Sequence, residues 1–418
     1  MAIDVYWRLP LHGCKGELGI GRANRGDWSA PVVGNLAPGF AGGDSDGSSY
    51  ADHLADIARA AEISGFYGGL LVSFPNTDDP WTIAPALARE TKTFRFMIAF
   101  QPGFIAPAHA ARLSASLQRV SGGRLVYNVI TGGGGPSQLW WGDRVAHDDR
   151  YARTSEFLDA LKVVWREGPV DYQGRFYQIE GGGLAPRLAA QKIPEIYFSG
   201  SSDAAVAAAG RHADYYLSHL EPFDALKEKL ERVRERTAAE GRRARFALRF
   251  DILARRTPEE AWAEVARAWQ NVDRKAVERL NAGTGDSVGF ARQSAFRAGL
   301  GSLLSYRDLD IDAHIAPGLW GGFHLFRGGP GIGVVGSYEQ AAAWLDRYLS
   351  AGIDAFVLAG TPHLEEAYRV GEEVLPLIRG RVRDQVTSGR PEDYPAVGAP
   401  AVGTEVEQAA QAQTSPGA

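Results

Sequence analysis

The chain has 418 residues, of which 45% are hydrophobic and 23% are charged, a composition typical of a globular protein with a large core. The formal net charge of −5 argues against the basic surface that binds nucleic acid, and the single cysteine, Cys14, excludes an intrachain disulfide and a cysteine-rich metal cluster. No apolar run reaches the roughly 18–20 residues of a membrane span, and the N-terminus lacks the pattern of a signal peptide. We therefore expect a cytoplasmic protein.

Strand-like apolar runs alternate with amphipathic helical stretches along most of the chain. Strands are predicted to begin near residues 4, 67, 94, 124, 195, 214, 245 and 354. Helices are predicted at 49–65, 81–90, 107–120, 153–167, 202–211, 222–240, 258–271, 338–350 and 364–379. A Gln-Gly pair within residues 170–179 predicts a small hairpin. Eight strand–helix units favour an α/β fold, a (β/α)8 TIM barrel, over an open doubly wound sheet.

Three segments interrupt this alternation. Residues 22–49 are rich in Gly, Asp, Ser, Pro and Asn, which predicts a long loop. Residues 272–335 read as an insertion with extra helices and a mobile Gly-rich loop. Residues 381–418 are rich in Ala, Pro, Gly, Gln and Thr and are predicted to be a disordered or partner-contacting tail. We therefore expect a single barrel domain over residues 1–380.

Polar residues gather where the predicted strands end, which is where a TIM barrel carries its active site. In strand order they are His12; Asn76, Thr77, Asp78 and Asp79; Gln101; Thr131; Gly200, Ser201, Ser202 and Asp203; Ser218, His219 and Glu221; Arg249 and Asp251; Thr361 and His363. This concentration of polar groups predicts that the functional site lies at that end of the barrel.

Two glycine-containing turns follow predicted strands. The first, "TGGGG" at 131–135, is either a flexible loop or a place where a flat or anionic ligand approaches the backbone, because glycine inside an element costs roughly 0.5–1 kcal/mol relative to alanine. The second, "GSSD" at 200–203, opens a helix. Its hydroxyls and backbone N–H groups could bind a phosphate, or they could simply cap the helix.

Other motifs carry weaker signals. "GIGVVG" at 331–336 fits a dinucleotide fingerprint, but it lies late in the chain and without a clear preceding strand. "HDDR" at 147–150 and "HLEE" at 363–366 lack the spacing of a metal site, so no metal is predicted. Asp78 and Asp79 are adjacent on a loop and make a poor glycosidase pair.

Two arginines stand out at the predicted barrel mouth. Arg249 lies inside an apolar strand, where an unpaired charge is costly, so either Asp251 on the same face or a bound anion should neutralise it. Arg327, in "LFRGGPG", lies beside glycines and is either a mobile anion clamp or a surface charge.

Taken in order, the stretches "WRLPLHG", "NVITG", "HDDRYARTSEFLDALKVVW", "VDYQGRFYQI", "YFSGSSD", "DSVG", "LFRGGPG" and "GIDAFVLAGTPHLEEAYRVGE" resemble one family. Over about residues 1–380 the chain resembles the flavin-dependent monooxygenases of the bacterial luciferase superfamily, and the alkanesulfonate monooxygenases above all. The resemblance implies a (β/α)8 barrel, a homodimer or homotetramer, and reduced FMN supplied by a separate NAD(P)H-dependent flavin reductase. It also implies that O2 adds to the flavin and that the peroxyflavin oxygenates a small organic substrate, cleaving a C–S bond to aldehyde and sulfite in the sulfonate branch.

The resemblance also assigns site residues. The positions that match the cofactor site are Ala99, Asn128, Thr131, Gly132, Tyr151, Gly200, Ser201 and Ser202. Among these, Tyr151, Ser201 and Ser202 match the positions that hold the flavin phosphate. A non-prolyl cis peptide at the end of the third strand, near Ala99–Phe100, is a further family expectation. The positions that match active-site residues of the sulfonate enzymes are His12, Arg249 and Arg327, and His363 is a further catalytic candidate as a proton donor or substrate hydrogen-bonder. A flat flavin against the strand ends would explain the glycines after Thr131.

The substrate half departs from the sulfonate enzymes. Thr77, His219, Asp251 and Thr361 stand where those enzymes carry Cys, Trp, His and Tyr, and Gly21 replaces a Glu. With Trp320, these first four residues are the predicted substrate contacts. The changes favour a larger or more polar organosulfur substrate, or another oxygenation such as N-hydroxylation or Baeyer–Villiger insertion. The alternatives are a deazaflavin-dependent dehydrogenase and a non-catalytic flavin-binding protein. A barrel glycosidase is the least favoured alternative.

Overall fold

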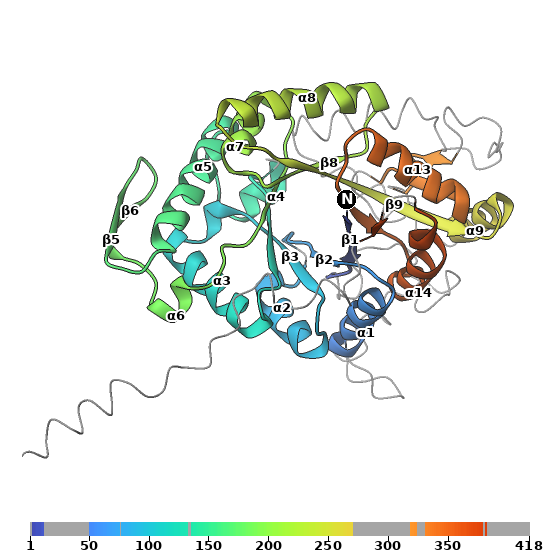
Figure 1. The fold of residues 1–418 in the computed structure, drawn as a ribbon, viewed down its shortest axis with the longest axis horizontal. Helices are drawn as coiled ribbons and strands as arrows, with labels where there is room; N and C mark the ends of the chain where they lie inside the picture. Colours follow the sequence, from blue (N-terminus) through green and yellow to red (C-terminus); the bar gives the residue numbers. More distant parts are fainter. Residues whose placement is uncertain are drawn as a thin grey trace, which may run out of the picture.

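The computed structural model describes residues 2–11, 50–75, 77–132, 135–270, 318–323, 331–378 and 381–382. Within these residues, eight parallel strands close into a barrel (Figure 1). They follow one another around the ring as β1 (Ala2–Leu9), β2 (Gly68–Leu71), β3 (Arg95–Phe100), β4 (Leu125–Val129), β7 (Ile196–Phe198), β8 (Tyr215–His219), β9 (Arg245–Arg255) and β12 (Ala355–Ala359). Pairing of β12 with β1 closes the ring. The predicted (β/α)8 barrel is confirmed.

Helices surround the strands, as Figure 1 shows. Their bounds are α1 (Tyr50–Ile63), α2 (Pro80–Glu90), α3 (Pro107–Ser121), α4 (Gly135–Trp140), α5 (His147–Val164), α6 (Pro186–Ala189), α7 (Asp203–His212), α8 (Phe223–Ala239), α9 (Pro258–Gln270), α13 (Tyr338–Ser350) and α14 (His363–Arg369). The helix predicted at 153–167 begins earlier, at His147, because Asp148 and Asp149 favour the positive end of the helix dipole. The helix predicted to run to 379 changes after Arg369 into a π-turn (Val370–Val374) and a 3-10 turn (Leu375–Leu377).

Two short strands extend the sheet beyond the barrel. β11 (Gly333–Ser337) pairs in parallel with the C-terminal half of β9, and β10 (Leu319–Trp320) pairs with β11. The "GIGVVG" stretch therefore forms a strand rather than a phosphate loop. Glycine is needed at 333 because a Cβ there would lie 2.8 Å from the Asp251 Cα. Two smaller pieces complete the fold. β5 (Val170–Gln173) and β6 (Gln178–Gly182) form the predicted hairpin, and β13 (Arg381–Val382) pairs with β1.

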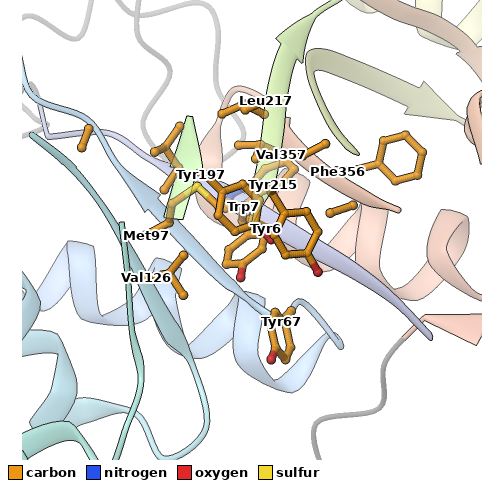
Figure 2. Close-up of a cluster of buried hydrophobic side chains, with 14 of the residues drawn as sticks. Tyr6, Trp7, Tyr67, Met97, Val126, Tyr197, Tyr215, Leu217, Phe356 and Val357 are labelled. Atoms are coloured by element: carbon orange, nitrogen blue, oxygen red, sulfur yellow. The ribbon is translucent and has the colours of Figure 1, made fainter. Parts of the chain in front are cut away.

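Aromatic side chains fill the middle of the barrel (Figure 2). The rings of Tyr6 on β1 and Tyr197 on β7 lie 5.7 Å apart, although these strands are not neighbours, so both side chains point inward. Tyr197 stacks on Tyr215 at 4.2 Å. Met97 and Val126 pair in register and lie beside this cluster in Figure 2. The barrel is thus a packed core rather than a pore, and any site must lie above it, at the C-terminal ends of the strands.

Among the described helices, none is both long enough and apolar enough to cross a membrane.

Candidate functional site

Strand register identifies the side chains that face the barrel mouth. Residues opposite one another on neighbouring parallel strands point to the same face of the sheet. Tyr6 points inward and pairs with Val357, which pairs with Arg249, which in turn pairs with His219. Arg249 and His219 therefore lie side by side in the upper part of the barrel, and Asp251, two residues further along β9, shares their face. Arg249 and Asp251 are both buried.

The same reasoning places two predicted cofactor residues on the opposite wall. Tyr197 points inward and pairs with Asn128, which pairs with Ala99. Asn128 and Ala99 thus face the barrel interior, on the same face of the sheet as Tyr197. Asn128 is 6% exposed, so its amide lies in a nearly closed environment.

Three buried oxygens at this end of β3 and β4 have no hydrogen-bond partner in the described part of the chain. They are Gln101 Oε1, Asn128 Oδ1 and Thr131 Oγ1. A buried polar atom left without a partner costs about 1–3 kcal/mol, so folded proteins rarely keep several together. Three such oxygens at the ends of β3 and β4 make this a candidate place for a ligand that donates hydrogen bonds.

The loop after β4 begins with a glycine held in a conformation that other residues rarely adopt. Gly132 has φ +95°, and its carbonyl oxygen accepts from Arg150 at 3.4 Å. Behind it, Asp143 accepts from Gln138 at 2.5 Å and pairs with Arg153 at 2.6 Å. Burial alone would raise the pKa of Asp143, but these hydrogen bonds and that of Val145 N–H lower it, so the carboxylate is charged at neutral pH. Gly133 and Gly134 lie outside the described residues.

A second group of predicted cofactor residues meets where α5 packs against α7. The Tyr151 hydroxyl lies near that of Ser202, and burial raises the pKa of Tyr151, so its phenol keeps its proton at neutral pH. Gly200 has φ +136° and lies against the Tyr151 hydroxyl. Its carbonyl oxygen accepts from Tyr216, and that of Ser201 accepts from Arg232 at 3.0 Å.

The capping interpretation of "GSSD" is confirmed, since the Ser202 hydroxyl accepts from Ala205 N–H at 3.2 Å. Capping does not use the Ser201 side chain or the Tyr151 phenol. Both hydroxyls lie beside the positive end of α7, which is a favourable place for an anion.

The remaining predicted residues lie around the rim or away from it. The Thr77 hydroxyl bonds to both backbone groups of Phe74 at 3.0 Å and so stabilises its own loop. Thr361 and His363 stand at the start of α14, where the His363 carbonyl accepts from Trp7 at 3.0 Å. Trp320 is 3% exposed and packs against Trp262 and Phe323.

Predicted residues His12, Arg327 and Gly21 lie outside the described residues. The expected cis peptide at Ala99–Phe100 is wrong. In the described chain the cis bonds are Gly168–Pro169 and Thr361–Pro362. The β3–β4 ladder runs in regular register through Phe100 and Val129, which leaves the backbone there in ordinary extended geometry.

Sequence reasoning named Gln101 only among the polar residues that follow strands, and it did not assign Arg150 or Asp143 to the site. Arg150 precedes Tyr151 within "HDDRYAR", which is the one local signal of its place. Among the described residues, no group of three potential metal ligands occurs, and the histidine and glutamate of "HDDR" and "HLEE" have other partners. His147 pairs with Asp148 at 2.7 Å, and Glu366 pairs with Arg255 at 2.9 Å.

Known structures share this fold. Riboflavin lyase (RcaE), solved with a modified FMN and riboflavin, is 20% identical, with 91% of this chain and 92% of that chain covered and a TM-score of 0.67. EDTA monooxygenase from Chelativorans sp. BNC1 is 19% identical, with 90% of this chain and 93% of that chain covered and a TM-score of 0.65. DmoA from Hyphomicrobium sulfonivorans is 17% identical, with 92% of this chain and 89% of that chain covered and a TM-score of 0.69. The model of the luciferase-like monooxygenase family matches residues 32–355, which is most of the chain. The chain therefore belongs to the luciferase-like monooxygenase family.

Proposed function

We propose that the protein is a reduced-FMN-dependent monooxygenase that uses O2 to oxygenate a small organic substrate. The observation that carries this proposal is the convergence, at one barrel mouth, of the Tyr151–Ser202 pair, the three unpartnered oxygens and the buried Arg249. Membership of the luciferase-like monooxygenase family supports the reaction class. In this proposal a NAD(P)H-dependent flavin reductase delivers the reduced cofactor, and the enzyme works as a homodimer or homotetramer.

The residues present fit FMN at both of its ends. A phosphate would be held by the protonated Tyr151 phenol, the Ser201 hydroxyl and the N-terminus of α7. A flat ring would lie along Ala99, Asn128, Thr131 and Gly132, where oxygens lack partners. Gly132 and Gly200 keep the backbone free of side chains at these places. When bound, reduced FMN would supply the electrons that activate O2, and the protein would supply orientation and exclude water.

The opposite wall has the chemistry to bind a polar substrate. The Arg249 guanidinium is permanently protonated, so it provides a fixed positive charge for an anionic group. His219 lies next to it in register and could donate or accept a proton at its imidazole. Asp251, on the same face, reduces the attraction for a simple sulfonate. This combination supports an organosulfur substrate that is larger or more polar than a short alkanesulfonate, with C–S cleavage to aldehyde and sulfite, over N-hydroxylation or Baeyer–Villiger insertion.

Stopped-flow oxidation tests the proposal. The protein is mixed anaerobically with reduced FMN, and the flavin spectrum is followed after O2 is added. We expect flavin oxidation in a kinetic phase that free FMN lacks and that accelerates with the right sulfonate, sulfone or amine. Oxidation indistinguishable from that of free FMN would contradict the proposal. A structural neighbour at 17% identity and TM-score 0.60 is an F420-dependent secondary alcohol dehydrogenase, so reduction of F420 by substrate without O2 would favour that chemistry instead.

Tyr151→Phe is expected to weaken FMN binding roughly 10–100-fold, because a hydrogen bond to a charged group contributes roughly 1.5–3 kcal/mol. The ring and its packing are retained, so the thermal unfolding midpoint should change little. Fluorescence titration with FMN measures the effect. Tyr348→Phe removes a buried hydroxyl on α13 and is the matched control. Equal FMN affinity in both variants would remove Tyr151 from the phosphate site.

A further inference from the structure

A hollow lies at the surface beside the loops that follow β3 and β4. Its volume is about 440 Å³, a size that suits a small organic molecule. It is formed by the 3-10 turn η2 (Pro102–Phe104), by the chain between α4 and α5, and by α5 itself. Its lining includes Gly103, Phe104, Trp141, Asp143, Arg144 and Arg153. The inward-facing Asn128, His219 and Arg249 do not line it, so the hollow is separate from the barrel wall described above.

One wall of the hollow is aromatic and partly open to solvent. The rings of Phe104 and Trp141 stack, with centroids 5.0 Å apart and 24° between their planes. Trp140 packs edge-on against Trp141 at 4.7 Å. Phe104 and Trp140 are 36% and 64% exposed, although a group of large apolar side chains at a protein surface usually marks a place of contact. This wall therefore offers a flat apolar surface on which a planar ring can stack.

The charged side chains of the lining leave one positive charge uncompensated. Arg153 pairs with Asp143 at 2.6 Å, so these two charges neutralise each other. Arg144 is exposed and forms no ion pair with any residue that the structure describes. An anionic group on a ligand would thus find a complementary guanidinium next to the aromatic wall.

Contacts within the chain fix the shape of the hollow. A Cβ on Gly103 would collide with the Arg153 guanidinium, so the glycine lets Arg153 reach Asp143. Asp143 also accepts from Gln138, whose side chain faces the turn at Gly132. The floor of the hollow is therefore held by the same hydrogen bonds that hold the glycine loop.

We propose that this hollow is a binding site for a planar aromatic anion, such as an aromatic carboxylate or sulfonate. The ring lies on Trp141 and Phe104, and the anionic group meets Arg144. The site is additional to the barrel mouth, and the proposal does not rest on the proposed function. A ligand that binds only the folded protein also raises its unfolding midpoint by mass action.

Calorimetric titration of the full-length protein with naphthalene-2-sulfonate tests the proposal. Binding should be weaker for cyclohexanesulfonate, which lacks the aromatic face, and for 2-naphthalenemethanol, which lacks the charge. Trp141→Leu should weaken binding of naphthalene-2-sulfonate about three- to tenfold, because an aromatic contact contributes about that factor. Arg144→Gln should weaken it about two- to fivefold, which is the range of an exposed charge pair.

Three further variants serve as controls. Trp344→Leu removes a partly buried tryptophan on α13, and Arg119→Gln removes an exposed arginine on α3. Both should bind naphthalene-2-sulfonate like the wild type. Arg249→Gln removes the cation of the barrel mouth and should also keep the wild-type affinity, because the proposed ligand does not reach that wall.

Three results would overturn the proposal. They are no binding of naphthalene-2-sulfonate by the wild type, equal affinity in Trp141→Leu and Trp344→Leu, and a loss in Arg249→Gln without one in Arg144→Gln. The last result would place the ligand inside the barrel mouth. If Trp141→Leu does not fold, Phe104→Leu replaces it with the same expectation. The test uses neither FMN nor O2, so its failure leaves the proposed function standing, and failure of the proposed function leaves this site standing.

Discussion

Replacing Glu366 by alanine is expected to lower the free energy of unfolding by about 3–5 kcal/mol, because it leaves the buried Arg255 with only the more distant carboxylate of Glu264, at 3.5 Å. Glu366 is fully buried on α14, where its two carboxylate oxygens accept from Arg255 at 2.9 and 3.1 Å. A third bond comes from Arg369 at 2.5 Å. Arg255 is 8% exposed, so water cannot replace the lost carboxylate.

Denaturant unfolding measures this effect. Glu372→Ala removes an exposed carboxylate only a short distance along the chain and should shift stability by less than about 0.5 kcal/mol. Glu366→Gln keeps an acceptor for Arg255 but not the negative charge. Its free energy of unfolding should therefore lie between those of Glu366→Ala and Glu372→Ala. Equal stability of Glu366→Ala and Glu372→Ala would show that the ion pair contributes nothing.

The Arg255–Glu366 pair also bears on the site. Arg255 is the last residue of β9, the strand that carries Arg249 and Asp251, and Glu366 lies one turn after His363 on α14. The ion pair therefore holds two walls of the barrel mouth together. We expect Glu366→Ala to weaken substrate binding as well as stability.

Most of the barrel could be predicted because most of its strands are short apolar runs. The helix at 338–350 was predicted with its observed bounds, and the structure shows why the start is so sharp. Ser337 and Gln340 form a reciprocal capping box. β11 was not predicted, because "GIGVVG" lacks the composition of a strand. Its glycine at 333 is explained only by the Asp251 backbone, which lies far away in sequence.

Some residues of the candidate site could likewise be predicted from the sequence, and others required the structure. The order of the sequence places Thr131 and Ser202 after predicted strands, whereas Asn128, which lies within β4, is assigned to the cofactor through the family resemblance. The place of Gln101 depends on its approach to Gly132, a contact that no local pattern records. Whether a buried oxygen has a partner is likewise a property of the folded chain. The double role of "GSSD", with Ser202 capping α7 while Ser201 stays free of that cap, also needed the structure.

Gly200→Ala is expected to remove most FMN binding, through two separate physical effects. Gly200 has φ +136°, a backbone conformation that side chains with a Cβ rarely adopt. An added Cβ would also lie 2.6 Å from both the Tyr151 hydroxyl and the Ala205 Cβ. Neither neighbour is the end of a flexible chain, so the turn or the Tyr151 ring must move. Either movement separates Tyr151 from Ser202, and we expect a loss of FMN affinity of about 100-fold or more, at the upper end of what one charged hydrogen bond supplies.

Gly241→Ala separates backbone strain from the loss of the site. Gly241 also has a positive φ, +67°, but an added Cβ there meets open space. That variant should lose roughly 1–2 kcal/mol of stability from strain while binding FMN like the wild type. FMN titration and thermal unfolding of both variants measure the two effects independently. Wild-type affinity in a folded Gly200→Ala protein would mean that FMN does not use this turn, and the phosphate site would then have to lie elsewhere at the barrel mouth.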